Sequence, residues 1–534
     1  MPTPRRPPMP KLPPFALAQA RPPARNQPYH LLVFFSLFAA PLFAIHLSLL
    51  PLPFFWDEHG QFIPTALDLL RTGAWVAHST IPNVHPPGVE AYLAACYKLF
   101  GYSIPLTRGA MLLVASAGLL FTFLLAIELS RGTQGAPAFL PPLFLLVSPL
   151  FYTQSMMAQL DMPAMVFTAV ALFLFLKKNY AAAAAACVAL VLAKETGLVT
   201  PLIFFLALAW RRDWKRAAYF IAPAAALLAW LIVLHRSTGY WLGNPGFAHY
   251  NVGYSLQPVR MALSFARRIY YLFFAEFRWI GTAVLLIAWK QPIFRNYAWR
   301  ITCAVAAVNF ILVSVLGGAE LERYLLPVVP LFYIAVSVAL TFVPKWVSAT
   351  ATAALAAGLI ASLFWNPPYP FPYENNWAMV DFVRLQQLAA DYVEQNFSTR
   401  TIATAWPYTA ALTDPDYGFV RRKLRVIETN DFHASSLRAL PPASYDVLIK
   451  YTRTWAPTSG IIALPIVRDF LSRFYEWQPD ITQEECTELG LHQVASWRLR
   501  GQEIAIYVRN GYAQSSVRAS SKLPVRRTPV TGTG

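Results

Sequence analysis

Two adjacent carboxylates, Asp57 and Glu58, follow the first long apolar run of the chain, within Phe55-Trp56-Asp57-Glu58-His59. Paired acids at a membrane surface are costly to desolvate, and such residues are usually functional. A carboxylate is also the group that can take a proton from an acceptor hydroxyl in a transfer reaction. The alternative is a solvated loop start with one residue of an interfacial aromatic belt. We take Asp57 and Glu58 as candidate catalytic acids.

A third acid, Asp161, lies in Gln159-Leu160-Asp161-Met162-Pro163 between two apolar segments. Pro163 suits the first position of the next helix, so Asp161 could simply cap that helix. The functional alternative is a carboxylate fixed beside a cavity at the membrane surface. Both interpretations place Asp161 at a helix end.

Further ionisable residues mark other ends of apolar segments. His85 lies in the rigid turn His85-Pro86-Pro87-Gly88, Lys194 is followed by Glu195, and Glu322 is followed by Arg323 and Tyr324. A lone histidine is more often structural than a ligand, and each charged pair could be a local ion pair of little energy. Together, however, these residues are expected to converge on one face.

Basic residues supply the second half of a transfer site. A phosphate leaving group requires Arg or Lys to hold its developing charge. Arg260, Arg267 and Arg268 are candidates for this role. The alternative for these three residues is anchoring to anionic lipid headgroups.

Composition identifies the elements that must position these residues. The 534 residues are 56% hydrophobic and only 13% charged, whereas a soluble domain carries about 25% charged residues. Segments of this apolar length cross about 30 Å of hydrocarbon. We expect a polytopic α-helical membrane protein with about eleven transmembrane helices, at 30–52, 108–127, 138–153, 163–177, 180–193, 197–210, 217–235, 270–289, 300–316, 324–342 and 346–364.

The distribution of Lys and Arg predicts the orientation. With the N-terminus in the cytoplasm, the inner loops carry most of the basic residues, as the positive-inside rule requires. The exceptions are Arg260, Arg267 and Arg268, which fall outside. All the candidate acids fall outside as well, which predicts a periplasmic site in a bacterial inner membrane. The net charge of +17 is explained by tails and inner loops, so we expect contact with the bilayer and no nucleic acid.

Four regions follow from this pattern. We expect a disordered basic cytoplasmic tail at 1–28, a transmembrane domain at 29–365, a periplasmic α/β domain at 366–510 and a disordered tail at 511–534. The first outer loop, 53–107, should hold short interfacial helices at 62–70 and 89–100. In the C-terminal region the periodicity predicts a helix at 379–397 and strands at 401–406, 424–428, 446–451, 493–499 and 503–508.

Cofactor signals are weak in this sequence. Glu58, His85 or His249 could contribute to a divalent metal site, but no spacing demands one. The four cysteines have no metal-ligand spacing and suggest no disulfide framework, and Cys187 and Cys303 fall within apolar helices.

An ordered set of short motifs resembles the GT-C superfamily of integral-membrane glycosyltransferases. The resemblance is greatest to the branch of protein O-mannosyltransferases and lipid A aminoarabinose transferases, and it covers about residues 30–365. The matching motifs are Trp56-Asp57-Glu58, Leu70-Arg71-Thr72-Gly73, His85-Pro86-Pro87-Gly88, Ala158-Gln159-Leu160-Asp161-Met162-Pro163, Lys194-Glu195-Thr196-Gly197 and Arg323-Tyr324-Leu325-Leu326-Pro327.

The resemblance implies an inverting transfer from a polyprenyl-phosphate sugar, a hexose or a pentose, to a lipid, glycan or protein hydroxyl at the periplasmic face. By analogy Asp57 is the general base, Glu58 lies beside it and Asp161 is the second essential acid. Arg323, an outer-loop arginine and Lys194 would hold the donor phosphate. Aminoarabinose transferases usually have a lysine where this chain has His85, which argues against that particular substrate.

Two other classes of function compete with this hypothesis. A transporter or flippase of a lipid-linked or anionic solute would bury charges near the middle of the membrane and often show inverted repeats, and neither is evident. A non-catalytic sensor would read ligands through the C-terminal region.

Overall fold

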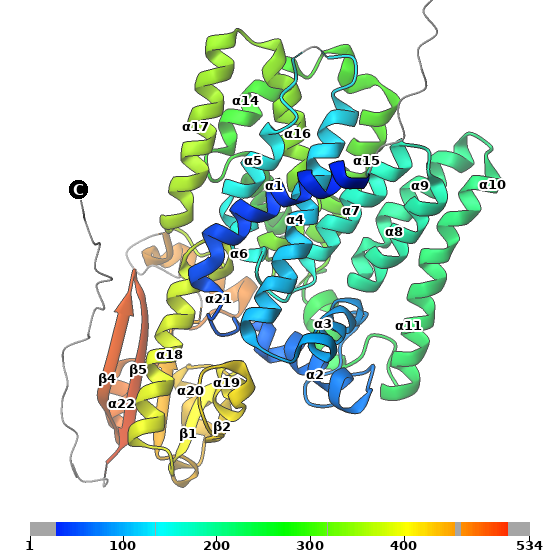
Figure 1. Cartoon of the computed structure of the whole chain (residues 1–534). Coiled ribbons are helices and arrows are strands. Elements are labelled where there is room, and N and C mark those ends of the chain that lie inside the picture. Colours follow the sequence, from blue (N-terminus) through cyan, green and yellow to red (C-terminus); the bar gives the residue numbers. More distant parts are fainter. Residues whose placement is uncertain (1–27, 134, 318, 454–460, 511–534) are drawn as a thin grey trace, which may run out of the picture.

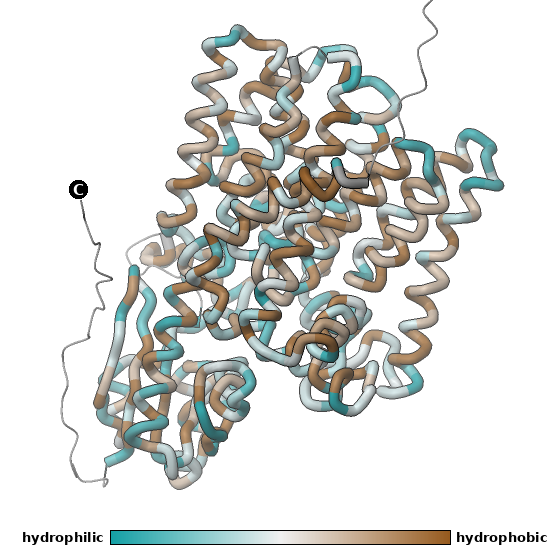
Figure 2. The backbone as a smooth tube through the Cα atoms, in the orientation of Figure 1, coloured by the Kyte–Doolittle hydropathy of each residue, from teal (hydrophilic) through white to brown (hydrophobic). Residues whose placement is uncertain are grey.

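The structure is a computed structural model and describes residues 28–133, 135–317, 319–453 and 461–510. The tails expected at 1–28 and 511–534 lie outside the described residues, except for Pro28, where the first helix begins. Figure 1 shows a bundle of helices with a small sheet at one end, and Figure 2 shows apolar helices between more polar ends.

Most of the bundle consists of apolar helices joined by short connections. Its members are α1 (Pro28–His46), α4 (Ile104–Leu129), α5 (Leu140–Val147), α6 (Pro149–Gln154), α7 (Asp161–Leu176), α8 (Tyr180–Ala193), α9 (Val199–Trp210), α10 (Trp214–Ala217), α11 (Ala222–Thr238), α13 (Pro258–Phe273), α14 (Arg278–Ala288), α15 (Tyr297–Val315), α16 (Val329–Ala339) and α17 (Lys345–Phe364). Cys187 and Cys303 lie within α8 and α15, as expected.

Within the described residues, five helices are long and apolar enough to cross a membrane: His30–Leu49, Ile104–Leu129, Trp214–Thr238, Tyr297–Val315 and Lys345–Phe364. A sixth results if α13 and α14, which are bent by 85°, form one span. Four shorter apolar helices are Asp161–Leu176, Tyr180–Ala193, Glu195–Trp210 and Val329–Phe342. The protein is therefore a multi-pass membrane protein, but the eleven crossings are not confirmed.

Two expected crossings are interrupted. The segment 138–153 divides into α5 and α6 at Ser148, because a residue before a proline avoids the helical conformation and Pro149 follows. The segment 270–289 turns sharply between α13 and α14, where Glu276 and Phe277 have φ values of 53° and 63°. Such left-handed backbone is uncommon for residues other than glycine.

The first outer loop folds largely as expected. A π-helical turn, Glu58–Phe62, leads into α2 (Ile63–Thr72), and α3 (Gly88–Phe100) follows the proline turn. At the same end of the bundle lie the short helix α12 (Pro245–Ala248) and a second π-helical turn, His249–Gly253. The basic helix α10 lies at the end of α11 that is remote from α2 and α3 (Figure 1). This separation agrees with the predicted division between basic and acidic connections.

The C-terminal region contains a five-stranded mixed sheet in the order β2-β1-β3-β5-β4. Its elements are α18 (Ala378–Asn396), β1 (Thr401–Ala405), α19 (Tyr408–Thr413), β2 (Arg425–Thr429), α20 (Ala434–Ala439), β3 (Val447–Tyr451), α21 (Pro465–Tyr475), α22 (Gln483–Glu488), β4 (Leu491–Leu499) and β5 (Gln502–Arg509). The strands β2, β1 and β3 are parallel, and β5 pairs antiparallel with β3 and β4. All five predicted strands and the predicted helix are present.

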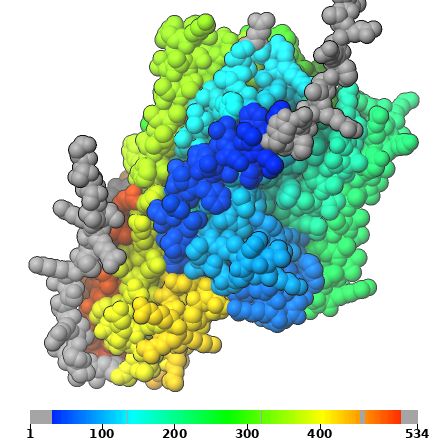
Figure 3. All heavy atoms as spheres, in the orientation of Figure 1, coloured from blue at the N-terminus to red at the C-terminus, as the bar shows by residue number. Residues whose placement is uncertain are grey.

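This sheet packs directly against the first outer loop (Figure 3). The ring of Phe382 in α18 meets Phe55 edge-on at 5.4 Å and Trp56 at 5.7 Å. The Trp406 ring lies edge-on to Trp56 at 6.2 Å. One continuous apolar core therefore joins the membrane helices to the C-terminal sheet, and it holds Phe55 and Trp56, the two residues before Asp57.

Candidate active site

A single guanidinium joins three acids from three separate segments. Arg323 lies in the 3-10 turn Glu322–Leu325 and forms ion pairs with Asp57, with Asp161 at 3.1 Å and with Glu374 at 2.8 Å. All four side chains are largely buried, with exposures between 4% and 15%. Buried charges of this kind require close partners, because their desolvation costs several kcal/mol per ion, as an order of magnitude.

Local structure brings each acid to Arg323. Asp57 immediately precedes the π-helical turn and follows Trp56, whose φ of 38° turns the chain out of the apolar run. Asp161 is the first residue of α7 but makes no capping hydrogen bond, because the N-cap position belongs to Leu160. The capping alternative for Asp161 is therefore wrong, and Pro163 is the third residue of the helix rather than the first.

Neighbouring charged residues do not pair with each other. Lys194 forms an ion pair with Asp161 and lies 4.2 Å above the ring of Tyr324, whereas Glu195 accepts a contact from His85 Nδ1 at 2.8 Å. In the same way Glu322 pairs with Arg267 at 2.6 Å, not with Arg323. The local ion pairs considered from the sequence are therefore replaced by long-range ones.

All of these residues except Glu322 line a cavity of about 1050 Å³. Its polar wall contains Asp57, His85, Asp161, Lys194, Glu195, Arg267, Arg323, Tyr324 and Glu374. Its other walls are largely apolar and come from the segment around α12, from the end of α15 and from Phe371. Trp406, Glu428 and Arg453 close it from the C-terminal sheet. The cavity thus lies between the membrane helices and the C-terminal region.

Glu374 was not singled out from the sequence. It lies in the 3-10 turn Tyr373–Asn375, ten residues beyond the end of α17, and its Oε1 atom is buried without a hydrogen-bond partner among the described residues. Burial raises the pKa of this carboxyl, Arg323 lowers it and the neighbouring acids raise it again, so that it lies at about 7. The signal in the sequence was a lone acid in an aromatic and proline-rich connection.

The electrostatics of Arg323 differ from those of Glu374. Burial alone lowers the pKa of Arg323, but Glu374, Asp57 and Asp161 together raise it far above its ordinary value. The guanidinium is therefore charged at all relevant pH values. Arg323 thus faces three carboxyl groups, and the pKa of Glu374 is raised to about 7, so this carboxyl gains a proton as the pH falls through neutrality.

Besides Glu322, three predicted residues lie away from the cavity wall: Glu58, Arg260 and Arg268. Glu58 is fully buried, accepts hydrogen bonds from the backbone of Phe55 and Ala158, and pairs with Arg108 of α4. Since both of its oxygens are engaged, we assign Glu58 a structural role rather than a catalytic one. Its ion pair ties the outer loop to α4.

Arg260 and Arg268 also lie outside this wall. Arg260 donates to the carbonyl of Phe474 at the end of α21 and lies 3.2 Å from the ring of Tyr254. It therefore connects α13 to the C-terminal region. Arg268 is 1% exposed and bonds Ser264, while its Nε and Nη2 atoms have no partner among the described residues.

Among the residues that the structure describes, no group of three or more His, Cys, Asp or Glu side chains could hold a metal ion. Glu58, His85 and His249 therefore do not form such a group.

Comparison with known proteins identifies the fold. The crystal structure of ArnT from Cupriavidus metallidurans bound to undecaprenyl phosphate superposes with a TM-score of 0.52 at 14% identity, over 90% of this chain and 98% of that one. A model of glycosyltransferase family 87, a GT-C family, matches residues 84–318. The chain has a GT-C fold.

Other GT-C structures match less closely. The oligosaccharyltransferase of Archaeoglobus fulgidus has a TM-score of 0.47 at 12% identity, over 79% of this chain and 68% of that one. The arabinofuranosyltransferase AftD from mycobacteria has a TM-score of 0.44 at 13% identity, over 91% of this chain and 40% of that one. No curated protein sequence matches this GT-C chain.

Proposed function

We propose that this protein is an inverting glycosyltransferase, which moves a hexose or pentose from a polyprenyl-phosphate donor to a hydroxyl of a lipid, glycan or protein. The observation that carries the proposal is the Arg323 cluster, which holds Asp57 at the wall of the cavity. This cavity is large enough for the sugar phosphate of the donor and the hydroxyl group of the acceptor. The undecaprenyl phosphate bound to ArnT supports a polyprenyl-phosphate donor.

In the proposed reaction Asp57 takes the proton of the acceptor hydroxyl as its oxygen attacks the anomeric carbon of the sugar. The bond between that carbon and the phosphate oxygen breaks, and the electron pair leaves with polyprenyl phosphate. Asp161 acts as a positioning residue, because it contacts both Arg323 and Lys194 rather than standing alone. Glu374 shares Arg323 with both acids and holds the C-terminal region to the site.

The leaving phosphate needs cations at the cavity wall. Lys194, Arg267 and His85 line it, and each already has a carboxylate partner that fixes its position. We assign the phosphate to this set, with Arg268 behind Arg267 on the same helix. Charge developing on the phosphate in the transition state would strengthen these contacts, which is the condition for catalysis.

We further propose that the site faces the periplasm of a bacterial inner membrane, with the N-terminus in the cytoplasm. The basic connections lie at the opposite end of the bundle from the first outer loop, and this supports the orientation.

The test is transfer of labelled sugar from a polyprenyl-phosphate donor by membranes that contain the wild type or Asp57→Asn. We expect the variant to lose activity by about 10² to 10⁴, the usual contribution of a general base. Asp469→Asn, on the exposed face of α21, is the matched control and should retain full activity. Equal transfer by wild type and Asp57→Asn would remove Asp57 from this role.

A further inference from the structure

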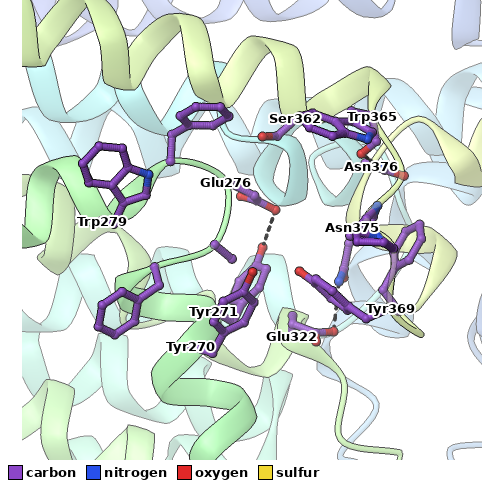
Figure 4. Close-up of a pocket in the computed structure, with 16 residues that line it drawn as sticks. Tyr270, Tyr271, Glu276, Trp279, Glu322, Ser362, Trp365, Tyr369, Asn375 and Asn376 are labelled. Atoms are coloured by element: carbon purple, nitrogen blue, oxygen red, sulfur yellow. Dashed lines mark hydrogen bonds between the residues drawn. The ribbon is translucent and has the colours of Figure 1, made fainter. Parts of the chain in front are cut away.

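A second cavity, of about 290 Å³, lies beside the cavity of the candidate active site, which we call the catalytic cavity. It is enclosed by the bend between α13 and α14, the end of α17 and the segment 365–376, and we call it the belt cavity (Figure 4). Phe371 lines both cavities. A contact also links them, because Glu322 pairs with Arg267 at the catalytic cavity and accepts a hydrogen bond of 2.9 Å from Asn375 at the belt cavity.

Half of the residues that line the belt cavity are aromatic. They include Tyr270, Tyr271, Trp279, Trp365 and Tyr369, which surround the hollow in Figure 4. Rings that served only as an interfacial belt would face lipid. Here they enclose a space that polar side chains also enter, so the wall presents flat aromatic faces and hydrogen-bonding groups to the same ligand.

The polar groups of this wall include a buried acceptor that lacks a donor. Asn375 is 6% exposed; its amide nitrogen bonds Glu322, but its Oδ1 atom has no hydrogen-bond partner among the described residues. An unsatisfied buried acceptor is unfavourable, and a hydrogen bond from a ligand would relieve that cost. Ser362 of α17 also contributes a hydroxyl to the wall of this cavity, next to Trp365 (Figure 4). A ligand that donates hydrogen bonds would satisfy Asn375.

The charge balance excludes a cationic ligand. The two acids of the wall are already neutralised, Glu276 by Arg278 at 2.6 Å and Glu322 by Arg267 at 2.6 Å. An aromatic cage for an ammonium group gains from unpaired negative charge, which is absent from the described wall. A neutral ring with hydroxyl groups fits better, because its C–H faces pack on aromatic rings and its hydroxyls donate to amide oxygens.

The position of the belt cavity indicates which molecule carries such a ring to it. It lies where the membrane-crossing helix Lys345–Phe364 ends, and Trp279 and Trp365 at its rim are 54% and 66% exposed. Exposed tryptophans at a helix end mark the level of lipid headgroups. We propose that the belt cavity binds the neutral sugar headgroup of a membrane glycolipid, at a site separate from the catalytic cavity.

Native mass spectrometry of the purified full-length chain tests this proposal. The probes are monoglucosyl diacylglycerol, diacylglycerol and phosphatidylethanolamine at equal concentrations. We expect the glycolipid to bind at least about tenfold more tightly than diacylglycerol, which corresponds to one or two satisfied hydrogen bonds. Ser362→Phe, which places a ring in the cavity, should abolish this preference, and Trp365→Ala should weaken it.

The matched control is Ala361→Phe, which adds the same ring to an exposed neighbouring position outside the cavity wall. It should bind the glycolipid as the wild type does. Glycolipid binding unchanged in both Ser362→Phe and Trp365→Ala would overturn the proposal, and so would tighter binding of phosphatidylethanolamine. Asp57→Asn should bind the glycolipid normally, so a failure of the transfer assay would leave this result intact.

Discussion

Arg323 and Glu374 form a buried ion pair at 2.8 Å that joins the end of the membrane bundle to the segment leading into the C-terminal sheet. The same guanidinium holds Asp57 and Asp161. The C-terminal region is thus part of the proposed active site rather than an appendage, because it supplies one of three carboxylates and packs Trp406 and Phe382 around Trp56.

Replacing Arg323 by lysine should uncouple this cluster. A single ammonium cannot reproduce the planar fork that contacts three carboxylates at once. We expect sugar transfer to fall by about 10²-fold, the scale of losing a positioned electrostatic group. Labelled-sugar transfer by membranes measures the effect, with Arg384→Lys on the exposed face of α18 as control. Full activity in Arg323→Lys would contradict the role of the fork.

Glu374 should make stability depend on pH. Because its pKa rises from the ordinary 4.5 to about 7 in the folded protein, the folded state holds a proton that the unfolded state releases in this range. The stabilisation from this group is present below about pH 4.5 and is lost as the pH rises through about 7. Glu374→Gln mimics the protonated form and should not show this loss.

The measurement is the unfolding temperature of both proteins between pH 5 and pH 8 in detergent. As the pH rises, the unfolding temperature of the wild type should fall relative to that of Glu374→Gln. The corresponding loss of unfolding free energy is on the order of 1–3 kcal/mol. A constant difference over the whole range would show that Glu374 does not titrate there.

Glu58→Gln should damage stability instead of chemistry. The change leaves the fully buried Arg108 without its carboxylate partner, which typically costs about 3–5 kcal/mol. Thermal unfolding in detergent measures the loss. The double variant Glu58→Gln with Arg108→Gln should recover part of it, because no uncompensated charge remains. Normal stability of the single variant would argue against the structural assignment.

Gly88→Ala should displace the turn that carries His85. A Cβ atom at Gly88 would lie 2.4 Å from the carbonyl oxygen of Leu192, which is backbone and cannot move aside. We expect a loss of unfolding free energy of about 1–3 kcal/mol, as for other overpacked sites, and reduced transfer. Gly109→Ala is the control, since its Cβ would meet only the ring of Phe43 at 3.9 Å. Unaltered unfolding of Gly88→Ala would contradict this packing.

The sequence by itself predicted the short helices and strands outside the membrane bundle and the end of the bundle at which the candidate site residues gather, but not the number of crossings. Apolar periodicity predicted the interfacial helices and all five strands, and lysine and arginine placement separated the basic helix α10 from the acids of the first outer loop. Such patterns are local, because a helix face or a strand face is set by residues a few positions apart.

Only the tertiary structure decided the partners. Lys194 and Glu195 are adjacent, yet their side chains contact different partners. Lys194 contacts Asp161, 33 residues away in the chain, and Glu195 contacts His85, 110 residues away. Glu58 had the same local signal as Asp57 but is turned inward to Arg108. Glu374 had almost no local signal, and it joins the site because folding brings the start of the C-terminal region against Arg323. The energy of an ion pair depends on the distance between the charges and on their burial, and the positions of two residues in the sequence give neither quantity.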